Sequence, residues 1–254
     1  MFRGVFKEKS MYKYLFASIL LTGLGYGLYK GVIDNYLAEV VTMSEFDRGV
    51  SEFFRELPGL ALVGILALFY EFSAEKIYKI GAVIMVIGMG MHFVLPADRI
   101  YMTLAIFVYS LGEHIKLGMK NALTLDYAEK DKGGNALGLQ KSVSEIGTLF
   151  GYLIVMVAFM FLSGVNAFKG FFVISTLIIG ISMVLSFKLT GNVKQDSSKQ
   201  RFYFNKKFTK YYFLEVFYGA RKQVFFTFGP YVLILFYQAN TAIISMLYAI
   251  SAVC

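Results

Sequence analysis

Two stripes of charged and tyrosine side chains could do chemistry in this chain. Each recurs at intervals of three or four residues inside an apolar stretch, the spacing that gathers side chains on one face of a helix. The stripes are Tyr109, Glu113, Lys116 and Lys120 in one stretch, and Lys141, Glu145, Thr148 and Tyr152 in the next. An acid near a base in apolar surroundings can bind a charged solute, and a desolvated carboxylate can take up and release a proton. The alternative is two structural ion pairs, Glu113 with Lys141 and Lys116 with Glu145, which would neutralise buried charge and join two helices.

Arg221 is a further candidate, and its role depends on where its helix begins. If the helix begins near Tyr211, Arg221 lies near mid-depth in the membrane and, with Lys116 and Lys141, favours an anionic or zwitterionic solute. If the helix begins near Val224, Arg221 is only an anchor at the membrane surface.

The stretches that carry these side chains belong to a series of long apolar segments. A hydrocarbon core of about 30 Å needs about 20 helical residues to cross it. The segments are continuously apolar rather than alternating, which predicts helices and not barrel strands. They cover Tyr14–Leu37, Asp47–Tyr70, Ile77–Leu95, Ile100–Leu123, Ala136–Leu162, Phe168–Lys188 and Tyr211–Phe236, and an incomplete eighth begins near Asn240. With a mean hydropathy of +0.60 and 57% apolar residues, the chain is predicted to be an all-α, polytopic helical membrane protein.

Basic residues are distributed unevenly between the two sets of connections. Fifteen lie in connections on the side of the N-terminus, against four on the other side, which are Arg48, Arg55, Arg99 and Lys169. Positively charged connections stay in the cytoplasm, so the N-terminus is predicted to be cytoplasmic in the cell membrane. The net charge of +8 is then explained by anionic lipid at that surface, and no nucleic-acid partner is expected.

Charge also follows a pattern of three helices. The third and sixth segments are almost free of ionisable residues, whereas the first, fourth and seventh are polar, so the third member of each triplet is predicted to be a lipid-facing support. This organisation resembles the major facilitator superfamily. Residues Glu75, Lys76 and Lys79 resemble part of that family's cytoplasmic gating loop, although Glu71 and Tyr78 stand where it has glycines. Three further parts of the chain are also similar to the corresponding connections of that family: the segments 122–126 and 133–136, and the basic link after the sixth helix.

The resemblance implies the first half of such a protein and the start of the second. Residues 1–13 would be a cytoplasmic tail, 14–188 a six-helix bundle, 189–210 a basic cytoplasmic linker, and 211–254 the seventh helix and part of an eighth, with the remaining helices of the second half as partner. It further implies a secondary transporter that moves a small polar solute by alternating access, coupled to protons. Glu113 and Lys141 resemble the family's arrangement of a carboxylate on the fourth helix opposite a base on the fifth.

Three other interpretations stay open: a non-transporting membrane scaffold, a membrane-embedded enzyme, and a fragment that is inactive alone. The chain contains two histidines, His92 and His114, in different segments, without the i, i+4 spacing of a membrane metalloenzyme. No enzyme activity, metal or other cofactor is therefore expected.

Overall fold

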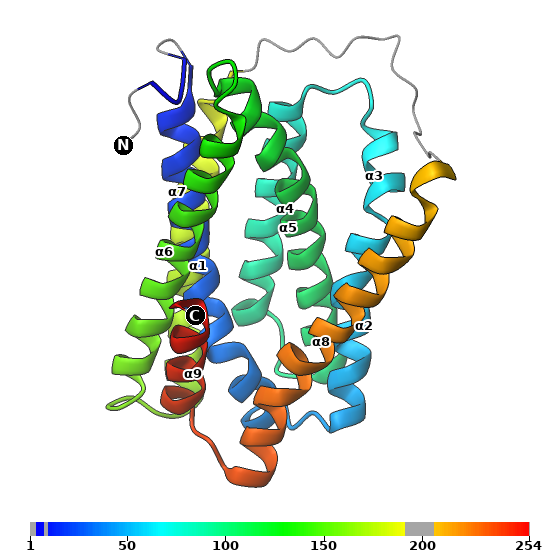
Figure 1. Cartoon of the computed structure of the whole chain (residues 1–254). Helices are drawn as coiled ribbons and strands as arrows, with labels where there is room; N and C mark the ends of the chain where they lie inside the picture. Colours follow the sequence, from blue (N-terminus) through cyan, green and yellow to red (C-terminus); the bar gives the residue numbers. More distant parts are fainter. Residues whose placement is uncertain (1–3, 8–9, 191–205, 254) are drawn as a thin grey trace.

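The apolar segments fold into helices that run roughly along one axis (Figure 1). The computed structural model describes residues 4–7, 10–190 and 206–253, apart from the side chains of 215–216 and 219–223. Its elements are α1 (Tyr12–Glu39), α2 (Glu45–Leu60), α3 (Leu62–Leu68), α4 (Ala74–Val94), α5 (Arg99–Tyr127), α6 (Gly133–Ala158), α7 (Val165–Phe187), the 3-10 turn η1 (Lys206–Phe208), α8 (Thr209–Tyr237) and α9 (Thr241–Val253). The prediction of an all-α helical bundle is confirmed.

The second predicted helix is interrupted at one residue, Ala61, although backbone hydrogen bonds continue on both sides of it. Pro58 lies inside α2, where it cannot donate to the preceding turn and crowds the carbonyl group four residues earlier. The helix ends two residues later at Leu60, and after Ala61 the chain resumes as α3. The predicted span Asp47–Tyr70 is therefore α2 and α3 in series.

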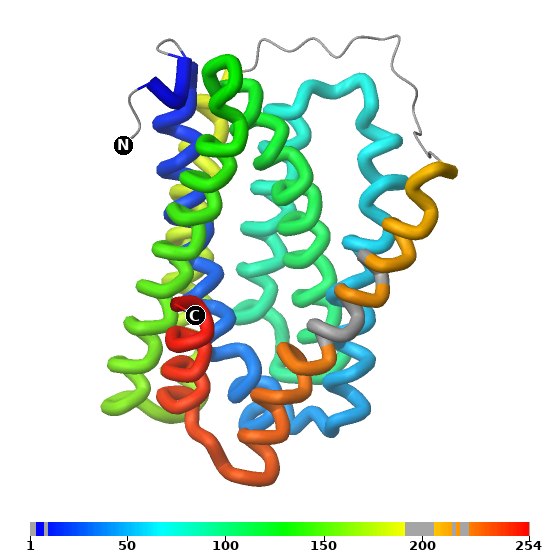
Figure 2. Tube along the Cα trace, viewed as in Figure 1, coloured from blue at the N-terminus to red at the C-terminus, as the bar shows by residue number. Residues whose placement is uncertain are grey.

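After α7 the chain runs back along the other helices as a helical hairpin. Figure 2 shows α8 descending beside α2, a sharp turn, and α9 rising beside α6. α8 begins at Thr209, close to Tyr211, and ends where Gln238 adopts a left-handed conformation with φ of 53°. Of the predicted basic linker 189–210, residues 191–205 lie outside the described residues.

Glycines bring two pairs of helices into close contact. A methyl group added to Gly27 of α1 would overlap the carbonyl oxygen of Thr148 in α6, and one added to Gly88 of α4 would overlap the backbone of Tyr109 in α5. Because small residues let backbones approach, α1 packs along α6 and α4 packs along α5. The space between these two pairs is where the functional site forms.

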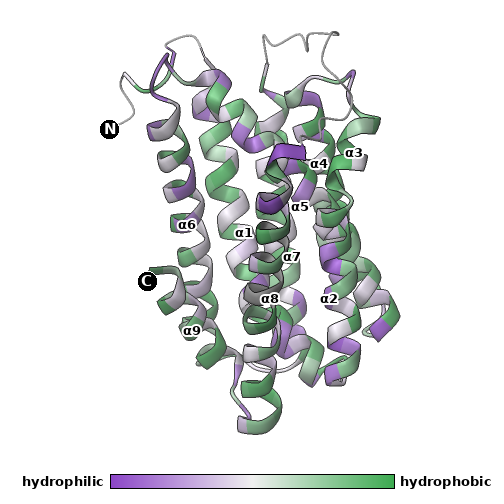
Figure 3. Ribbon diagram, turned by 45° about the vertical axis from the view of Figure 1, so that its right-hand side comes forward, coloured by the Kyte–Doolittle hydropathy of each residue, from purple (hydrophilic) through white to green (hydrophobic). Residues whose placement is uncertain are grey.

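The outward faces of the bundle are apolar. α1, α4, α6 and α7 are each long and apolar enough to cross a membrane, and Figure 3 shows hydrophobic residues along most of the helix length. α7 exposes Ile174, Leu177, Ile181 and Val184 at helical spacing. These surfaces match a hydrocarbon solvent, and the chain is an integral membrane protein. The sixth predicted helix is nevertheless more than a lipid-facing support, because its Ser182 is buried in a polar network with α1.

The hairpin of α8 and α9 is hydrogen-bonded to the other helices near the end of the bundle where α1 finishes. Among the described residues, four side-chain hydrogen bonds join the two parts. They run from Tyr231 to the Met43 carbonyl (2.6 Å), from Asn35 to the Ala239 carbonyl (3.0 Å), from Ser245 to the Gly31 carbonyl (2.9 Å) and from Tyr248 to the Asp34 carboxylate (2.5 Å). We call this set of contacts the seam.

Candidate functional site

A cavity of about 570 Å³ lies between the α1–α6 pair and the α4–α5 pair, with further walls from α2, α8 and α9. Along α1 its lining extends from Ile19 to Leu37, a rise of about 27 Å. The cavity therefore follows most of the depth of a bilayer. Its charged lining consists of Lys30, Arg48, Glu52, Arg55, Glu56, Glu113, Lys116, Lys120 and Glu145, and its tyrosines are Tyr26, Tyr29, Tyr78, Tyr109, Tyr152 and Tyr248.

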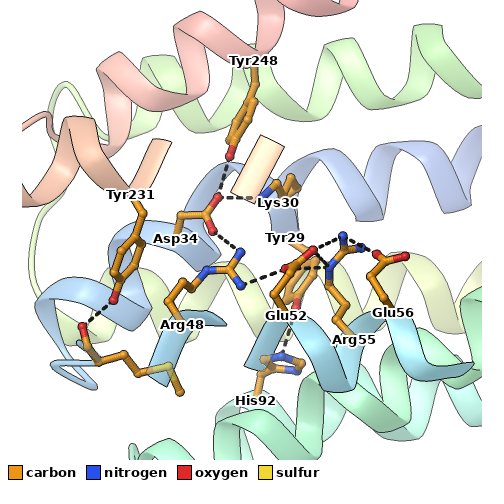
Figure 4. Close-up of polar contacts among 11 residues, drawn as sticks. Tyr29, Lys30, Asp34, Arg48, Glu52, Arg55, Glu56, His92, Tyr231 and Tyr248 are labelled. Atoms are coloured by element: carbon orange, nitrogen blue, oxygen red, sulfur yellow. Dashed lines mark hydrogen bonds and ion pairs between the residues drawn. The ribbon is translucent and has the colours of Figure 1, made fainter. Parts of the chain in front are cut away.

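Asp34 is the centre of a buried cluster at the end of the cavity beside the seam (Figure 4). Its carboxylate is 1% exposed and accepts from Lys30 at 2.6 Å, one turn away on α1. It also accepts from Arg48 of α2 at 3.1 Å and from the Tyr248 hydroxyl of α9 at 2.5 Å. One acid thus joins three helices, and its charge is balanced by two cations.

The cluster continues along α2. Glu52 accepts from the other terminal nitrogen of Arg48 at 2.9 Å, and it pairs with Arg55 at 2.5 Å. Arg55 also pairs with Glu56 at 2.6 Å. These cations of the cavity wall are therefore already bound to acids of the protein, which reduces their capacity to hold a charged solute.

Lys116 is buried with hydroxyl partners instead of an acid. Its ammonium group donates to Thr22 of α1 at 2.5 Å and to Ser182 of α7 at 3.2 Å, and it lies 5.0 Å from the centre of the Tyr78 ring. The predicted pair between Lys116 and Glu145 is therefore wrong for this conformation.

The structure also contradicts the predicted pair between Glu113 and Lys141. The prediction took helices that are neighbours in sequence, α5 and α6, to be neighbours in space. In the structure α5 packs mainly on α4 and α6 on α1; α5 and α6 meet near their connection, where Gln140 donates to Asn121, and the cavity lies between them farther along. Within the described part of the chain, neither Glu113 nor Lys141 forms an ion pair.

Three predicted site residues line the cavity without an ion pair to any described residue. Glu113 is half-buried on α5, one turn from Lys116, and Glu145 is exposed on α6 across the cavity. Tyr109 is buried against the ring of Tyr29, 4.9 Å between centroids, and its hydroxyl lacks a hydrogen-bond partner among the described residues. The cavity therefore presents two carboxylates without a described ion pair, together with the cations Lys116 and Lys120.

The remaining predicted residues lie elsewhere. Lys141 is exposed one turn from Glu145 toward the start of α6, on the same stripe, and the cavity lining of α6 begins only at Ser144. Arg221 belongs to α8, but its side chain lies outside the described residues.

The predicted gating residues lie in the first turns of α4, at the end of the bundle where α1 begins. Glu75 is half-buried and Lys76 is exposed. Lys79 donates to the carbonyl oxygen of Leu189, just after α7, at 2.8 Å. This contact joins two helices of the first six, and a role in gating stays a prediction.

The residues that sequence reasoning missed are Arg48, Glu52 and Arg55. The distribution of basic residues between the two sides of the membrane predicts that Arg48 and Arg55 lie at the surface. Their spacing of four and three residues was the available signal, because it predicts one charged face on α2.

Solved structures with a similar fold include transporters. The crystal structure of the nucleoside transporter NupG is similar with a TM-score of 0.72 and 17% identity, over 96% of this chain and 64% of that one. A point mutant of NupG gives a TM-score of 0.72 and 18% identity, over 96% and 65%. The crystal structure of an auto-inhibited peptide transporter of the POT family gives 0.59 and 9%, over 74% and 39%.

These likenesses show the fold, which is the helical bundle of the major facilitator type that the sequence predicted. The chain spans about 64% of the length of NupG. No protein-family model matches the sequence, and no curated protein matches it in sequence.

Proposed function

We propose that this protein is a secondary active transporter of the cell membrane, which moves a small zwitterionic or anionic solute by alternating access and couples this movement to protons. The observation that carries the proposal is the cavity, in which Glu113 and Lys116 have no oppositely charged partner among the described residues. A volume of about 570 Å³ is in the range that small-molecule sites occupy. The similar fold of two kinds of solute transporter supports the same class of function.

The charges that are left unpaired favour a solute with both signs. We assign the solute's anionic group to Lys116, which can keep one hydroxyl contact while it donates to a carboxylate or phosphate. We assign a cationic group to Glu113 or Glu145, which lie on opposite walls. Tyr109 would pack against the solute, and its hydroxyl could then find a partner. A neutral nucleoside would use neither charge, so amino acids and short peptides fit the lining better.

Glu113 is also our candidate for the coupling proton. A carboxylate in a membrane cavity is costly while ionised and unpaired, so protonation and solute binding are alternative ways to neutralise it. Lys141, at the mouth of the cavity, would attract anionic solutes without touching them at the bound position.

The seam supports alternating access. The described hydrogen bonds between the α8–α9 hairpin and the other helices all lie near the end of the bundle where α1 finishes. The described residues therefore fit a state that is closed at that end and open where α1 begins. The excess of basic residues at the N-terminal side supports a cytoplasmic position for the open end. Membrane lipid is then the surrounding partner.

Uptake into proteoliposomes containing the complete native protein tests the proposal. We expect pH-dependent uptake of an amino acid or dipeptide, which Glu113→Gln makes independent of pH and Lys116→Met abolishes. Glu129→Gln is the matched control, because Glu129 is exposed in the connection after α5. Full pH-dependent uptake by both Glu113→Gln and Lys116→Met would refute the assignment of these residues. If a nucleoside is carried and amino acids and peptides are not, the solute class is wrong although transport stands.

Two alternatives make different predictions. A non-transporting scaffold gains no thermal stability from any solute, whereas a transporter gains about 2.7 kcal/mol at a solute concentration of 100 times Kd. A membrane-embedded enzyme would turn over a substrate without moving it.

A partner that supplies further helices is part of our proposal, because the matched transporter is longer than this chain. The intact mass of the native protein tests it. A value near twice 28.6 kDa would support a partner half within the same protein. A value near 28.6 kDa would require a second chain to complete the cavity, or leave the chain inactive alone.

A further inference from the structure

A second concave site lies on the outside of the bundle, between α2 and α5. Its volume is about 540 Å³. The apolar lining consists of Phe46, Val50, Phe54 and Leu57 from α2, and Ile100, Leu104 and Phe107 from α5, with Thr103 beside them. Asp47 and Arg99 lie on the same lining. We call this site the α2–α5 groove.

The groove faces away from the solute cavity. Each residue turns a helix by about 100°, so on α2 the side chains of Val50, Phe54 and Leu57 point about 120–180° away from that of Arg48, which lines the cavity. On α5 the groove residues are likewise turned away from Glu113. The groove and the cavity thus occupy opposite faces of the same two helices, and the groove opens on the outside of the described bundle.

The groove has a charged end and an apolar end, as a phospholipid has. Asp47 and Arg99 lie in the first turns of α2 and α5, at the bundle end where α1 finishes. Phe54 and Phe107 lie two turns farther along, a rise of about 10–12 Å. One leaflet of the hydrocarbon core is about 15 Å deep. A lipid with its headgroup at the charged end would therefore place its upper acyl chain against both phenylalanines.

The charged end presents one cation and one anion with free hydrogen-bonding capacity. Arg99 lies 3.6 Å from Asp47, too far for a hydrogen bond, and its side chain is 66% exposed. One carboxylate oxygen of Asp47 accepts from the amide and the hydroxyl of Ser44 at the start of α2. The other faces Arg99. The guanidinium group can thus bind a phosphate in the bidentate manner, and the second oxygen of Asp47 can accept from a cationic donor.

We propose that the α2–α5 groove binds one zwitterionic phospholipid whose headgroup carries a primary ammonium group, as phosphatidylethanolamine does. Arg99 binds the phosphate, Asp47 accepts from the ammonium group, and the apolar lining holds an acyl chain. A phosphatidylcholine headgroup has no N–H to donate, and a phosphatidylglycerol headgroup has no cation for Asp47. Headgroup selection therefore follows from the pairing of these two residues.

The test uses the full-length native protein in nanodiscs of equal parts phosphatidylethanolamine, phosphatidylcholine and phosphatidylglycerol. Native mass spectrometry then identifies the lipid that remains bound after the protein is released from the nanodisc. We expect one phosphatidylethanolamine per protein, enriched about tenfold over the other two, the effect of about one charge-assisted hydrogen bond. Asp47→Asn keeps an oxygen for the contact with Ser44 and should lose the preference over phosphatidylcholine. Arg99→Gln should lose retention altogether.

Controls separate this site from ordinary lipid contact. Lys169→Gln removes another cation, in the first turns of α7 and outside the groove, and should change nothing. Leu104→Trp fills the groove without altering either charge and should also abolish retention, and circular dichroism verifies that each variant is folded. Bound lipid in the proportions of the bulk bilayer would overturn the proposal. So would enrichment of phosphatidylglycerol that depends on Arg99 but not on Asp47, since that is anionic lipid held by a lone cation.

Discussion

Replacing Arg48 by methionine tests whether the buried ion pairs hold α1 and α2 together. Arg48 is 4% exposed, and its terminal nitrogens donate to Glu52 at 2.9 Å and to Asp34 at 3.1 Å. Breaking a buried pair costs about 3–5 kcal/mol, because the charge left behind is poorly solvated. Both carboxylates keep another partner, Lys30 or Arg55, so we expect the lower limit, about 3 kcal/mol. For a chain of this size the Tm should fall by about 6–12 °C.

Far-ultraviolet circular dichroism of the full-length protein in detergent micelles measures this change. Arg99→Met is the matched control, since the pair of Arg99 with Asp47 is long and exposed and contributes no more than about 1 kcal/mol. Arg48→Lys keeps the charge but not the planar fork that reaches two carboxylates, so only part of the loss should be recovered. If the Tm falls no more for Arg48→Met than for Arg99→Met, water screens the cluster and the reasoning is refuted.

Three further predictions concern packing, the seam and the cavity. Gly27→Leu should cost about 1–3 kcal/mol or more by separating α1 from α6, whereas Gly180→Leu, with open space at its Cβ, should leave the Tm nearly unchanged. Tyr248→Phe removes a buried donor to the Asp34 carboxylate and should lower the free energy of unfolding by about 1.5–3 kcal/mol, with equal unfolding of wild type and variant as the contrary result. Lys116→Met should raise the Tm while it abolishes solute uptake, because a buried ammonium without an acid is costly; a lower Tm would show that its hydroxyl contacts outweigh that cost.

The positions of the helices were predictable because a bilayer leaves little choice. Backbone groups in hydrocarbon have to be bonded within their own segment, so the length of an apolar run sets a helix. The exception is the second segment, because a proline inside a membrane helix can be accommodated or can interrupt it, and here α2 ends two residues after Pro58.

The pairing of helices was not predictable from the same pattern. Neighbours in sequence are often neighbours in space, and that rule led to the wrong pair between Glu113 and Lys141. Glycines such as Gly27 determine which helices pack together, and the contact of Gly27 with α6 depends on the surfaces of both helices. The burial of Arg48 was not predictable for a related reason. A charge near a helix end can face water or a cavity, and only the packing around α2 decides between them.

The hydrogen bonds of the seam set part of the energy needed to separate the two parts of the molecule, and the apolar contacts of α9 with α6 add to it. Three of the four hydrogen bonds each contribute a net of about 0.5–1.5 kcal/mol, and the one from Tyr248 to the Asp34 carboxylate contributes about 1.5–3 kcal/mol, hence about 3–7.5 kcal/mol together. At the lower limit of these bonds alone, the separated arrangement would be populated by about one molecule in 160, and by fewer once the apolar contacts are included. A ligand that prefers the separated arrangement by about 5.5 kcal/mol could reverse a strongly biased equilibrium. The arrangement described here thus depends on a few side chains. Removing the hydroxyl group of Tyr231 or Tyr248 should shift the equilibrium toward the separated arrangement.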